Sequence, residues 1–165
     1  MIEIVGIAGA GTMGRGIAQI AASAGCRVLL FDAREGAAQE ACQTLAASFA
    51  KLGEKGKITA EQAQAAAERI TAVTLSSPDL ARCQLIVEAI VENIDAKKSL
   101  FAELEKIVSP DCILASNTSS LSITSIATAC ANPSRMAGLH FFNPVPLMKV
   151  VEVLAGLHTS SETIT

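Results

Sequence analysis

The sequence predicts an α/β fold in which a mainly parallel β-sheet is covered by helices on both faces. Three observations predict it: short, continuous apolar runs recur along the chain, they alternate with longer helical segments, and the first ends in a glycine-rich turn. Strands that are apolar on both faces need helices on both sides, and those helices connect parallel strands. At 165 residues, 50% of them hydrophobic, the chain suits one domain with a sizeable core.

Each strand is predicted from a short apolar run, and each helix from a run of helix-forming residues between two strands. In chain order, the predicted strands are residues 2–9, 26–32, 71–75, 84–90, 112–116, 135–142 and 149–156. The predicted helices are residues 13–25, 34–53, 55–70, 95–108 and 119–130.

The N-terminal elements follow from their composition. IEIVGIAG is an apolar run that ends in glycine, and the Ala-rich segment after it is compatible with a helix. CRVLLFD is a second apolar run, and the long helix behind it has charged ends and stops at Gly53. A second helix follows directly, with Thr59 as a plausible N-cap, so we expect a helical hairpin inserted between strands.

The C-terminal elements continue the alternation and then change direction. TAVTL, QLIVEAI and CILAS are short apolar runs separated by helical patterns. Pro144 and Pro146 interrupt the last two apolar runs and force a loop, so the final strand is expected to fold back antiparallel. Thr159 to Glu162 then has the capping-box form T-x-x-E, but too few residues follow for a helix, which predicts a frayed or differently docked C-terminus.

Composition argues against several classes of function. A formal charge of -3 and a pI of about 5.4 argue against a broad nucleic-acid-binding face. No apolar run suits a membrane span and no basic leader precedes the first strand, so we expect a soluble, cytoplasmic protein. The five cysteines are odd in number and widely spaced, which predicts reduced, buried thiols and no metal site.

The turn after the first strand carries a dinucleotide-binding pattern. In GAGTMG, Gly9, Gly11 and Gly14 fit G-x-G-x-x-G, which requires a tight turn, close approach of the backbone to a pyrophosphate, and close helix packing, respectively. Thr12 and Met13 lie in the same turn, at a helix start whose free N–H groups can bind phosphate. The pattern predicts a Rossmann-type, doubly wound sheet.

Asp32 stands where such a fold needs an acid. It ends the second strand, 18 residues beyond Gly14, where a carboxylate can bind ribose hydroxyls and repel a 2'-phosphate. We therefore expect NAD rather than NADP as the cofactor, although Arg34 nearby keeps NADP possible. The alternative role for Asp32 is the N-cap of the next helix.

One of the two histidines, His140, lies in an apolar run, and a glutamate lies in the next apolar run. His140 and Glu152 lie six residues on either side of Pro146, so a turn centred there would make them cross-strand neighbours. The carboxylate would accept a hydrogen bond from one ring nitrogen and leave the other to take a proton from a substrate alcohol. The alternative is a half-buried histidine with no catalytic role. His158 has no such partner and is expected at the surface.

Along essentially its whole length, the chain resembles the N-terminal, NAD-binding domain of the L-3-hydroxyacyl-CoA dehydrogenases. The resemblance lies in GAGTMGRGIA, FD, VEAIVEN, SNTSSL and GLHFFNPVPLMKVVEV. It implies that His140 is the general base, that Glu152 is its partner, and that Ser119 and Asn143 lie near the substrate and the nicotinamide. The cofactor contacts that it implies are Asp32, Ala89, Glu92 and Lys97.

These residues also have plain structural alternatives. Ser119 could cap a helix, Asn143 could be a turn residue, and Glu92 with Lys97 could form a solvated pair. Three lysines at the tip of the helical hairpin could meet the phosphates of CoA, but a solvated helix end is the better interpretation. They are Lys51, Lys55 and Lys57.

The resemblance implies reversible, NAD-dependent oxidation of an L-3-hydroxyacyl-CoA to a 3-ketoacyl-CoA, as in fatty acid metabolism and β-oxidation. It also implies a helical domain after residue 165 that completes the acyl-CoA cleft and forms a homodimer, so residues 1–165 alone would bind NAD with little turnover. Three alternatives stay open: a sugar-acid dehydrogenase of the lambda-crystallin type, a non-catalytic NAD-binding protein, and a β-hydroxyacid dehydrogenase with a lysine base.

Overall fold

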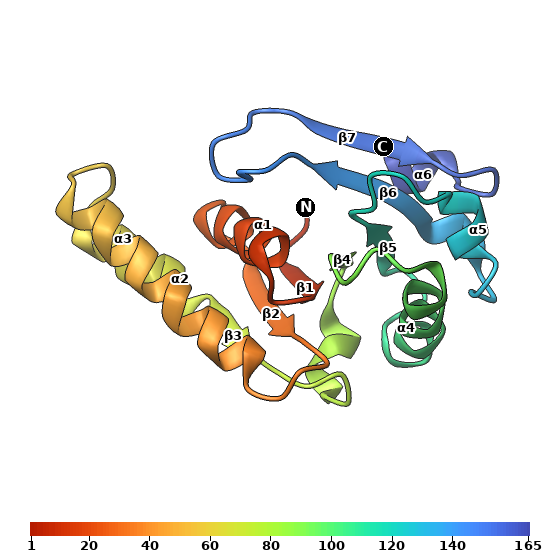
Figure 1. Ribbon diagram of the computed structural model, residues 1–165, viewed down its shortest axis with the longest axis horizontal. Helices are drawn as coiled ribbons and strands as arrows, with labels where there is room; N and C mark the ends of the chain where they lie inside the picture. The colour runs from red at the N-terminus through yellow and green to blue at the C-terminus, as the bar shows by residue number, and fades with distance from the viewer.

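The computed structural model describes all residues 1–165 and contains one seven-stranded sheet (Figure 1). The strand order is β3-β2-β1-β4-β5-β6-β7, and the only antiparallel pair is β6 with β7. The strands are β1 (Ile4–Ala8), β2 (Arg27–Phe31), β3 (Ile70–Ala72), β4 (Leu85–Glu88), β5 (Ile113–Ser116), β6 (Met136–Phe141) and β7 (Val151–Ala155).

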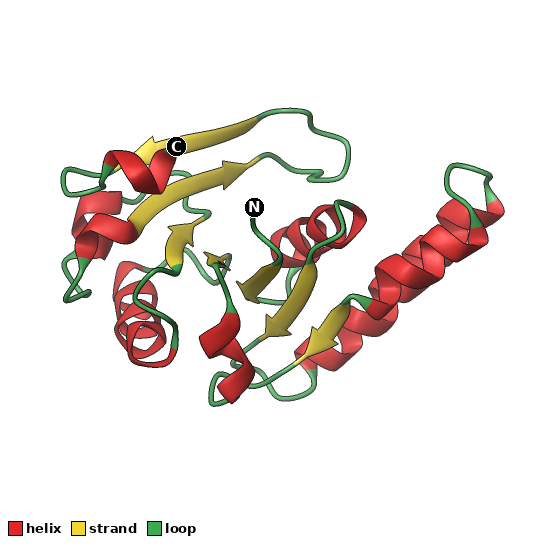
Figure 2. Ribbon diagram, turned by 180° about the vertical axis from the view of Figure 1, so that it is seen from behind, coloured by secondary structure: helices red, strands yellow, loops and turns green.

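Helices lie on both faces of this sheet, as Figure 2 shows from behind. The α-helices are α1 (Thr12–Ser23), α2 (Ala37–Glu54), α3 (Ala60–Glu68), α4 (Ile94–Ile107), α5 (Ile123–Ala127) and α6 (Ser161–Ile164). Two short 3-10 helices, η1 (Pro78–Arg82) and η2 (Pro133–Arg135), lie in connections. The predicted fold class is therefore confirmed, including the helical hairpin α2–α3 and the antiparallel last strand.

The core consists of two apolar clusters, one on each face of the sheet. Val28 and Leu30 of β2 belong to the cluster that includes residues of α1, α2 and α3, whereas Leu29 and Phe31 of the same strand belong to the cluster that includes residues of α4, α5 and η1. Successive residues of a strand point to opposite faces, so a strand covered on both sides is apolar at every position. That is why the strands read as continuous apolar runs.

Local signals predicted one helix cap correctly and misplaced another. Thr59 Oγ1 accepts a hydrogen bond from the Gln62 N–H at 3.0 Å, and Gln62 Oε1 accepts one from the Thr59 N–H at 2.9 Å. The C-terminal prediction was wrong, because α6 does form a turn and its N-cap is Ser160. Thr159 instead donates through Oγ1 to the Met136 carbonyl at 2.6 Å, which ties the chain to β6.

The helix predicted over residues 119–130 was also too long. Only Ile123–Ala127 is helical, and its N-cap is Ser122, whose side chain accepts from the Ser125 N–H. Residues before the helix bend instead, because Thr118 Oγ1 accepts a hydrogen bond from the Leu121 N–H at 2.9 Å. This bend leaves Ser119 exposed at the end of β5.

Two further findings concern the cysteines and the helices. All five cysteines are free. The prediction that they are buried is confirmed for Cys83, Cys112 and Cys130 and was wrong for Cys26 and Cys42, which are partly exposed. No helix combines the length and the apolar character needed to cross a membrane.

Candidate active site

The glycine-rich turn joins β1 to α1 and has the predicted geometry at two of its three glycines. Gly9 has a φ of +106°, and a Cβ there would come within 2.5 Å of the Ala89 carbonyl oxygen. A Cβ at Gly14 would lie 1.7 Å from the Gly9 carbonyl oxygen, so only glycine allows the helix to start so close to the turn. A Cβ at Gly11 would meet nothing within 4 Å, so Gly11 faces open space.

Asp32 connects this turn to the end of β2. Its carboxylate accepts hydrogen bonds from the Ala10 N–H at 2.7 Å and from the Arg34 N–H at 2.8 Å. The alternative role as a helix N-cap was wrong, because α2 begins at Ala37 with Gly36 as its N-cap. A carboxylate has more lone pairs than these two contacts use, so Asp32 can still accept from a ligand.

Two adjoining cavities collect most of the predicted site residues at the carboxyl ends of β1, β2, β4 and β5. One, of about 510 Å³, is lined by Gly9, Gly11, Asp32 and Ala89 among others. The other, of about 310 Å³, is lined by Met13, Ala89, Glu92, Lys97, Ser119, His140 and Asn143 among others.

Ala89 and Ile90 line both cavities, so the two adjoin at the end of β4. This is the point where the strand order reverses between β1 and β4, and ligands of open α/β sheets bind there. The open space at Gly11, the acceptor at Asp32 and the paired cavities fit a dinucleotide laid across this edge. Thr12 is exposed at the first position of α1, beside the larger cavity's glycines.

His140 and Glu152 are cross-strand partners in the β6–β7 register, as the spacing about Pro146 predicted. His140 Nδ1 lies 2.9 Å from Glu152 Oε2, and the two side chains are 17% and 51% exposed, respectively. A carboxylate only accepts, so Nδ1 donates and the neutral ring keeps its lone pair on Nε2. His140 lines the smaller cavity and Glu152 does not, so the glutamate supports the ring from outside.

The loop between β6 and β7 is held against α1. Val145 is buried, and a Cβ at Gly16 would come within 2.7 Å of the Val145 Cβ, so the absence of a side chain at Gly16 makes room for the loop. Asn143 lies at a bend in this loop, directly before Pro144, and is also part of the cavity wall. The prolines thus form a loop, and Gly16 determines where the loop lies.

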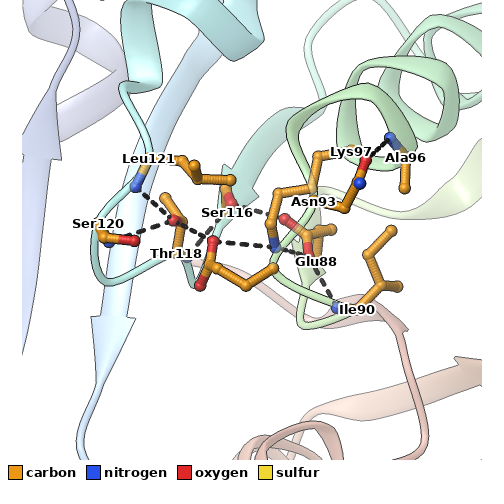
Figure 3. A network of polar contacts seen from close by, with 10 residues as sticks. Glu88, Ile90, Asn93, Ala96, Lys97, Ser116, Thr118, Ser120 and Leu121 are labelled. Carbon is orange, nitrogen blue, oxygen red and sulfur yellow. Dashed lines mark hydrogen bonds and ion pairs between the residues drawn. The ribbon is translucent and has the colours of Figure 1, made fainter.

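A buried polar network lies behind the smaller cavity, and sequence reasoning missed its centre (Figure 3). Glu88, at the end of β4, is 0% exposed. Its Oε1 accepts from Lys97 Nζ at 2.5 Å and from the Ile90 N–H at 2.7 Å, and its Oε2 accepts from Ser116 Oγ at 2.6 Å. Lys97 is 1% exposed, so the alternative of a solvated pair with Glu92 was wrong.

Two further residues of the smaller cavity, Ser119 and Asn117, differ in whether the sequence predicted them. Ser119 caps no helix, and it lines the smaller cavity as expected for a site residue. Asn117, which sequence reasoning did not select, lines the same cavity and accepts a hydrogen bond from the Phe141 N–H at 2.9 Å. Polar residues at the carboxyl ends of buried parallel strands were the signal that could have found Glu88 and Asn117.

Some predicted residues lie outside the two cavities. His158 is exposed, as predicted. The three lysines of the helical hairpin, Lys51, Lys55 and Lys57, are exposed at its tip. No group of three or more His, Cys, Asp or Glu side chains is placed to hold a metal ion.

Comparison with known proteins agrees with this geometry. Residues 4–165 match the family described as 3-hydroxyacyl-CoA dehydrogenase, NAD binding domain. The chain is 48% identical over 158 residues to a probable 3-hydroxybutyryl-CoA dehydrogenase of Deinococcus radiodurans, covering 96% of this chain and 56% of the relative. It is 44% identical over 163 residues to the 3-hydroxyadipyl-CoA dehydrogenase of Escherichia coli, covering 99% of this chain and 34% of the relative.

A solved structure extends the agreement to three dimensions. The crystal structure of a 3-hydroxybutyryl-CoA dehydrogenase from Escherichia coli superposes with a TM-score of 0.95 at 44% identity, over 99% of this chain and 34% of that one. The chain thus spans between about a third and somewhat more than half of the length of these relatives. The match in sequence and fold places the chain in the 3-hydroxyacyl-CoA dehydrogenase family, as an NAD-binding domain of that family.

Proposed function

We propose that this domain serves the reversible, NAD-dependent oxidation of an L-3-hydroxyacyl-CoA to a 3-ketoacyl-CoA. The observation that carries the proposal is the His140–Glu152 pair at 2.9 Å, with His140 on the wall of a cavity that Ser119 and Asn143 also line. Oxidation of an alcohol requires a base for the hydroxyl proton, and a histidine held by a carboxylate is well suited to it.

Most of the proposed cofactor residues line one of the two cavities. Gly9, Gly11 and Asp32 line the larger one, where the glycine turn would hold the pyrophosphate and Asp32 would bind the adenine ribose. Thr12 and Gly14 line neither cavity and lie in the first turn of α1, next to that turn. The nicotinamide end would lie in the smaller cavity, against the residues Met13, Ala89, Glu92 and Lys97. When bound, NAD supplies the acceptor for the electron pair and hydrogen that leave the substrate carbon.

The chain's own residues handle the proton and the substrate oxygen. Nε2 of His140 takes the C3 hydroxyl proton, while Glu152 keeps the ring oriented and offsets the positive charge that develops on it. Ser119 and Asn143, both exposed at the cavity, would hydrogen-bond the C3 oxygen and hold it beside the ring. A positioned base of this kind contributes roughly a hundred- to ten-thousandfold in rate.

The rival functions make different demands on the same site. A lysine-base mechanism would use Lys97, the one lysine that lines the smaller cavity, but its ammonium group is paired with the buried Glu88 carboxylate at 2.5 Å. A sugar-acid substrate would share the base and differ in the group beyond the C3 carbon. A non-catalytic NAD-binding protein would not need the His140–Glu152 pair.

We further propose an acyl-CoA partner, a place in fatty acid metabolism such as β-oxidation, a cytoplasmic location and a homodimer. The names of the relatives support the acyl-CoA substrate, and the five free thiols agree with a reducing compartment. Binding of nucleic acid or membranes is not part of the proposal, because the net charge is -3.

The test is an assay of acetoacetyl-CoA reduction with NADH, run beside a panel of sugar acids with NAD. We expect reduction of acetoacetyl-CoA and no oxidation of sugar acids by a longer chain that carries this domain, and little turnover by residues 1–165 alone. Turnover of sugar acids only would favour the alternative of a sugar-acid dehydrogenase. A non-catalytic NAD-binding protein would be favoured if calorimetry shows NAD binding but neither acetoacetyl-CoA nor any sugar acid is turned over, in the 165-residue chain and in any longer natural form.

A further inference from the structure

Glu88 occupies a position that the reaction chemistry does not explain. Its side chain is fully buried and lines neither cavity, so it touches neither cofactor nor substrate in the proposed arrangement. A buried carboxylate is costly unless it is paired and fully hydrogen-bonded, and an apolar residue of similar size could fill the same space. The buried negative charge of Glu88, with its three hydrogen-bond donors, therefore requires an explanation.

Those three donors come from three separate elements that meet behind the smaller cavity (Figure 3). Lys97 is on α4, Ile90 follows β4, and Ser116 ends β5. Lys97 and Ile90 both line the smaller cavity, so Glu88 holds two parts of its wall directly.

Ser116 extends the network to a third part of the wall. Its Oγ donates to Glu88 and accepts from the Thr118 N–H at 3.3 Å. Thr118 Oγ1 in turn donates to Glu92 Oε1 at 2.5 Å, and both Glu92 and the neighbouring Ser119 line the cavity. Glu88 thus lies at the centre of contacts that reach the cavity by two routes.

The Lys97 ammonium group carries three N–H donors and gives one of them to Glu88. Glu92 Oε1 lies 3.9 Å away, too far for a hydrogen bond, so donors remain available on the cavity side. Because Glu88 neutralises the Lys97 ammonium group from one side, this group can donate hydrogen bonds to a ligand without placing an unpaired charge in the site. Lys97 as donor and Glu92 as acceptor, side by side, match the hydroxyl groups of a sugar or an amide.

We propose that Glu88 is a positioning residue of the NAD site, which holds the Lys97 ammonium and the β5–α5 connection so that their polar groups face the nicotinamide end of the cofactor. This inference rests on the proposed placement of NAD across the two cavities. Glu88 acts through Lys97, so its effect on NAD affinity should depend on whether Lys97 is present.

The experiment is calorimetric NAD titration of this chain with Glu88→Gln, Lys97→Met and the double variant, each beside thermal unfolding. We expect Glu88→Gln to weaken NAD binding by about tenfold or more, the order of one charge-assisted hydrogen bond. In the Lys97→Met background, Glu88→Gln should weaken NAD binding clearly less than it does in the wild type, because only the route through Ser116 and Thr118 then remains.

Glu105 offers a matched control for simple structural loss. Its carboxylate is largely buried, accepts the Ala131 N–H at 2.7 Å and the Asn132 N–H at 2.9 Å, faces Arg135 at 3.5 Å, and lines neither cavity. Glu105→Gln should lower the unfolding temperature and leave NAD affinity unchanged. A drop in NAD affinity as large as that of Glu88→Gln would overturn the proposal.

If the Glu88→Gln variant does not fold, Ser116→Ala is the variant to use in its place. It removes one donor to Glu88 and keeps the charge pair, and we expect NAD binding to weaken by a factor of about two to ten, as for one neutral hydrogen bond. Wild-type affinity in a folded Glu88→Gln or Ser116→Ala variant would overturn the positioning role alone. Failure of the wild-type chain to bind NAD would overturn the placement of the cofactor as well.

Discussion

His140 is the residue on which the proposed chemistry depends most. His140→Gln keeps a polar side chain of similar length but removes the base, so turnover should fall by roughly a hundred- to ten-thousandfold. NAD affinity should stay nearly unchanged, because His140 does not line the larger cavity beside the glycine turn. Steady-state rates in an active form of the protein, beside calorimetric NAD titration, measure both effects.

His158→Gln is the matched control, since it is the other histidine of the chain and is exposed. We expect it to leave both rate and affinity unaltered. Equal rates for His140→Gln and the wild type would remove the general-base assignment, and a large loss of NAD affinity would show that His140 acts in cofactor binding instead.

Asp32 should determine which dinucleotide is preferred. Asp32→Ala removes both an acceptor for ribose hydroxyls and a charge that repels a 2'-phosphate, so NAD should bind about tenfold more weakly and discrimination against NADP should shrink. Arg34 does not replace it, because its guanidinium group is paired with Glu40 at 2.9 Å. Titrations with NAD and NADP give the ratio.

Asp111→Ala, at an exposed carboxylate that lines neither cavity, is the control for general effects of charge. If the NAD-to-NADP ratio of Asp32→Ala equals that of the wild type, Asp32 serves only to hold the turn through Ala10 and Arg34.

At the scale of elements, the contact of α1 with the β6–β7 loop positions Asn143. Gly16→Ala adds a Cβ within 2.7 Å of the Val145 Cβ, an overpacking that costs about 1–3 kcal/mol and opposes a helix-propensity gain of about 1 kcal/mol. The loop should therefore shift away from α1. Amide hydrogen exchange over residues 142–150 should become faster, with a small net loss of stability.

Gly53→Ala is the comparison within α2, where the added Cβ would meet the Ala63 Cβ at an ordinary 3.6 Å. It should raise the free energy of unfolding by up to about 1 kcal/mol and leave the loop's exchange unaltered. Unchanged exchange in Gly16→Ala would mean that Val145 does not anchor the loop.

For the whole molecule, the packing of both faces of the sheet predicts how the thiols react. Burial raises the pKa of Cys83 to about 11, of Cys112 to about 12 and of Cys130 to about 11, so these thiols stay protonated and shielded at pH 8. At that pH, Ellman's reagent should label no more than the two partly exposed cysteines of the native chain, Cys26 and Cys42, and all five in denaturant.

The sign of the pH dependence follows from those pKa values. Labelling of the buried thiols should increase only as the pH rises towards 11 for Cys83 and Cys130 and towards 12 for Cys112. Burial also raises the pKa of Cys42, which slows its labelling at pH 8. Rapid labelling of four or five thiols in the native chain would show that one face of the sheet is open.

The features that the sequence by itself determined depend on residues that are close together along the chain. The strands, the helical hairpin, the Thr59 cap and the glycine turn depend on residues a few positions apart, and antiparallel pairing about Pro146 fixes the partner of His140 by counting outward from the turn. The local signal at Thr159 failed because a distant contact, with the Met136 carbonyl, competed with it, whereas the helix predicted over residues 119–130 was shortened by the local turn at Thr118.

Only the tertiary structure decided the rest, because it depends on which strands lie side by side. Glu88 meets Lys97 across a loop and Ser116 from the adjacent strand β5, so its burial and its role cannot be read from VEAIVEN. Likewise, only packing decided that Lys97 is a buried partner rather than a solvated one, and that Gly16 makes room for Val145. A local pattern selects an element, whereas burial and the partners of a buried charge are properties of the assembled sheet.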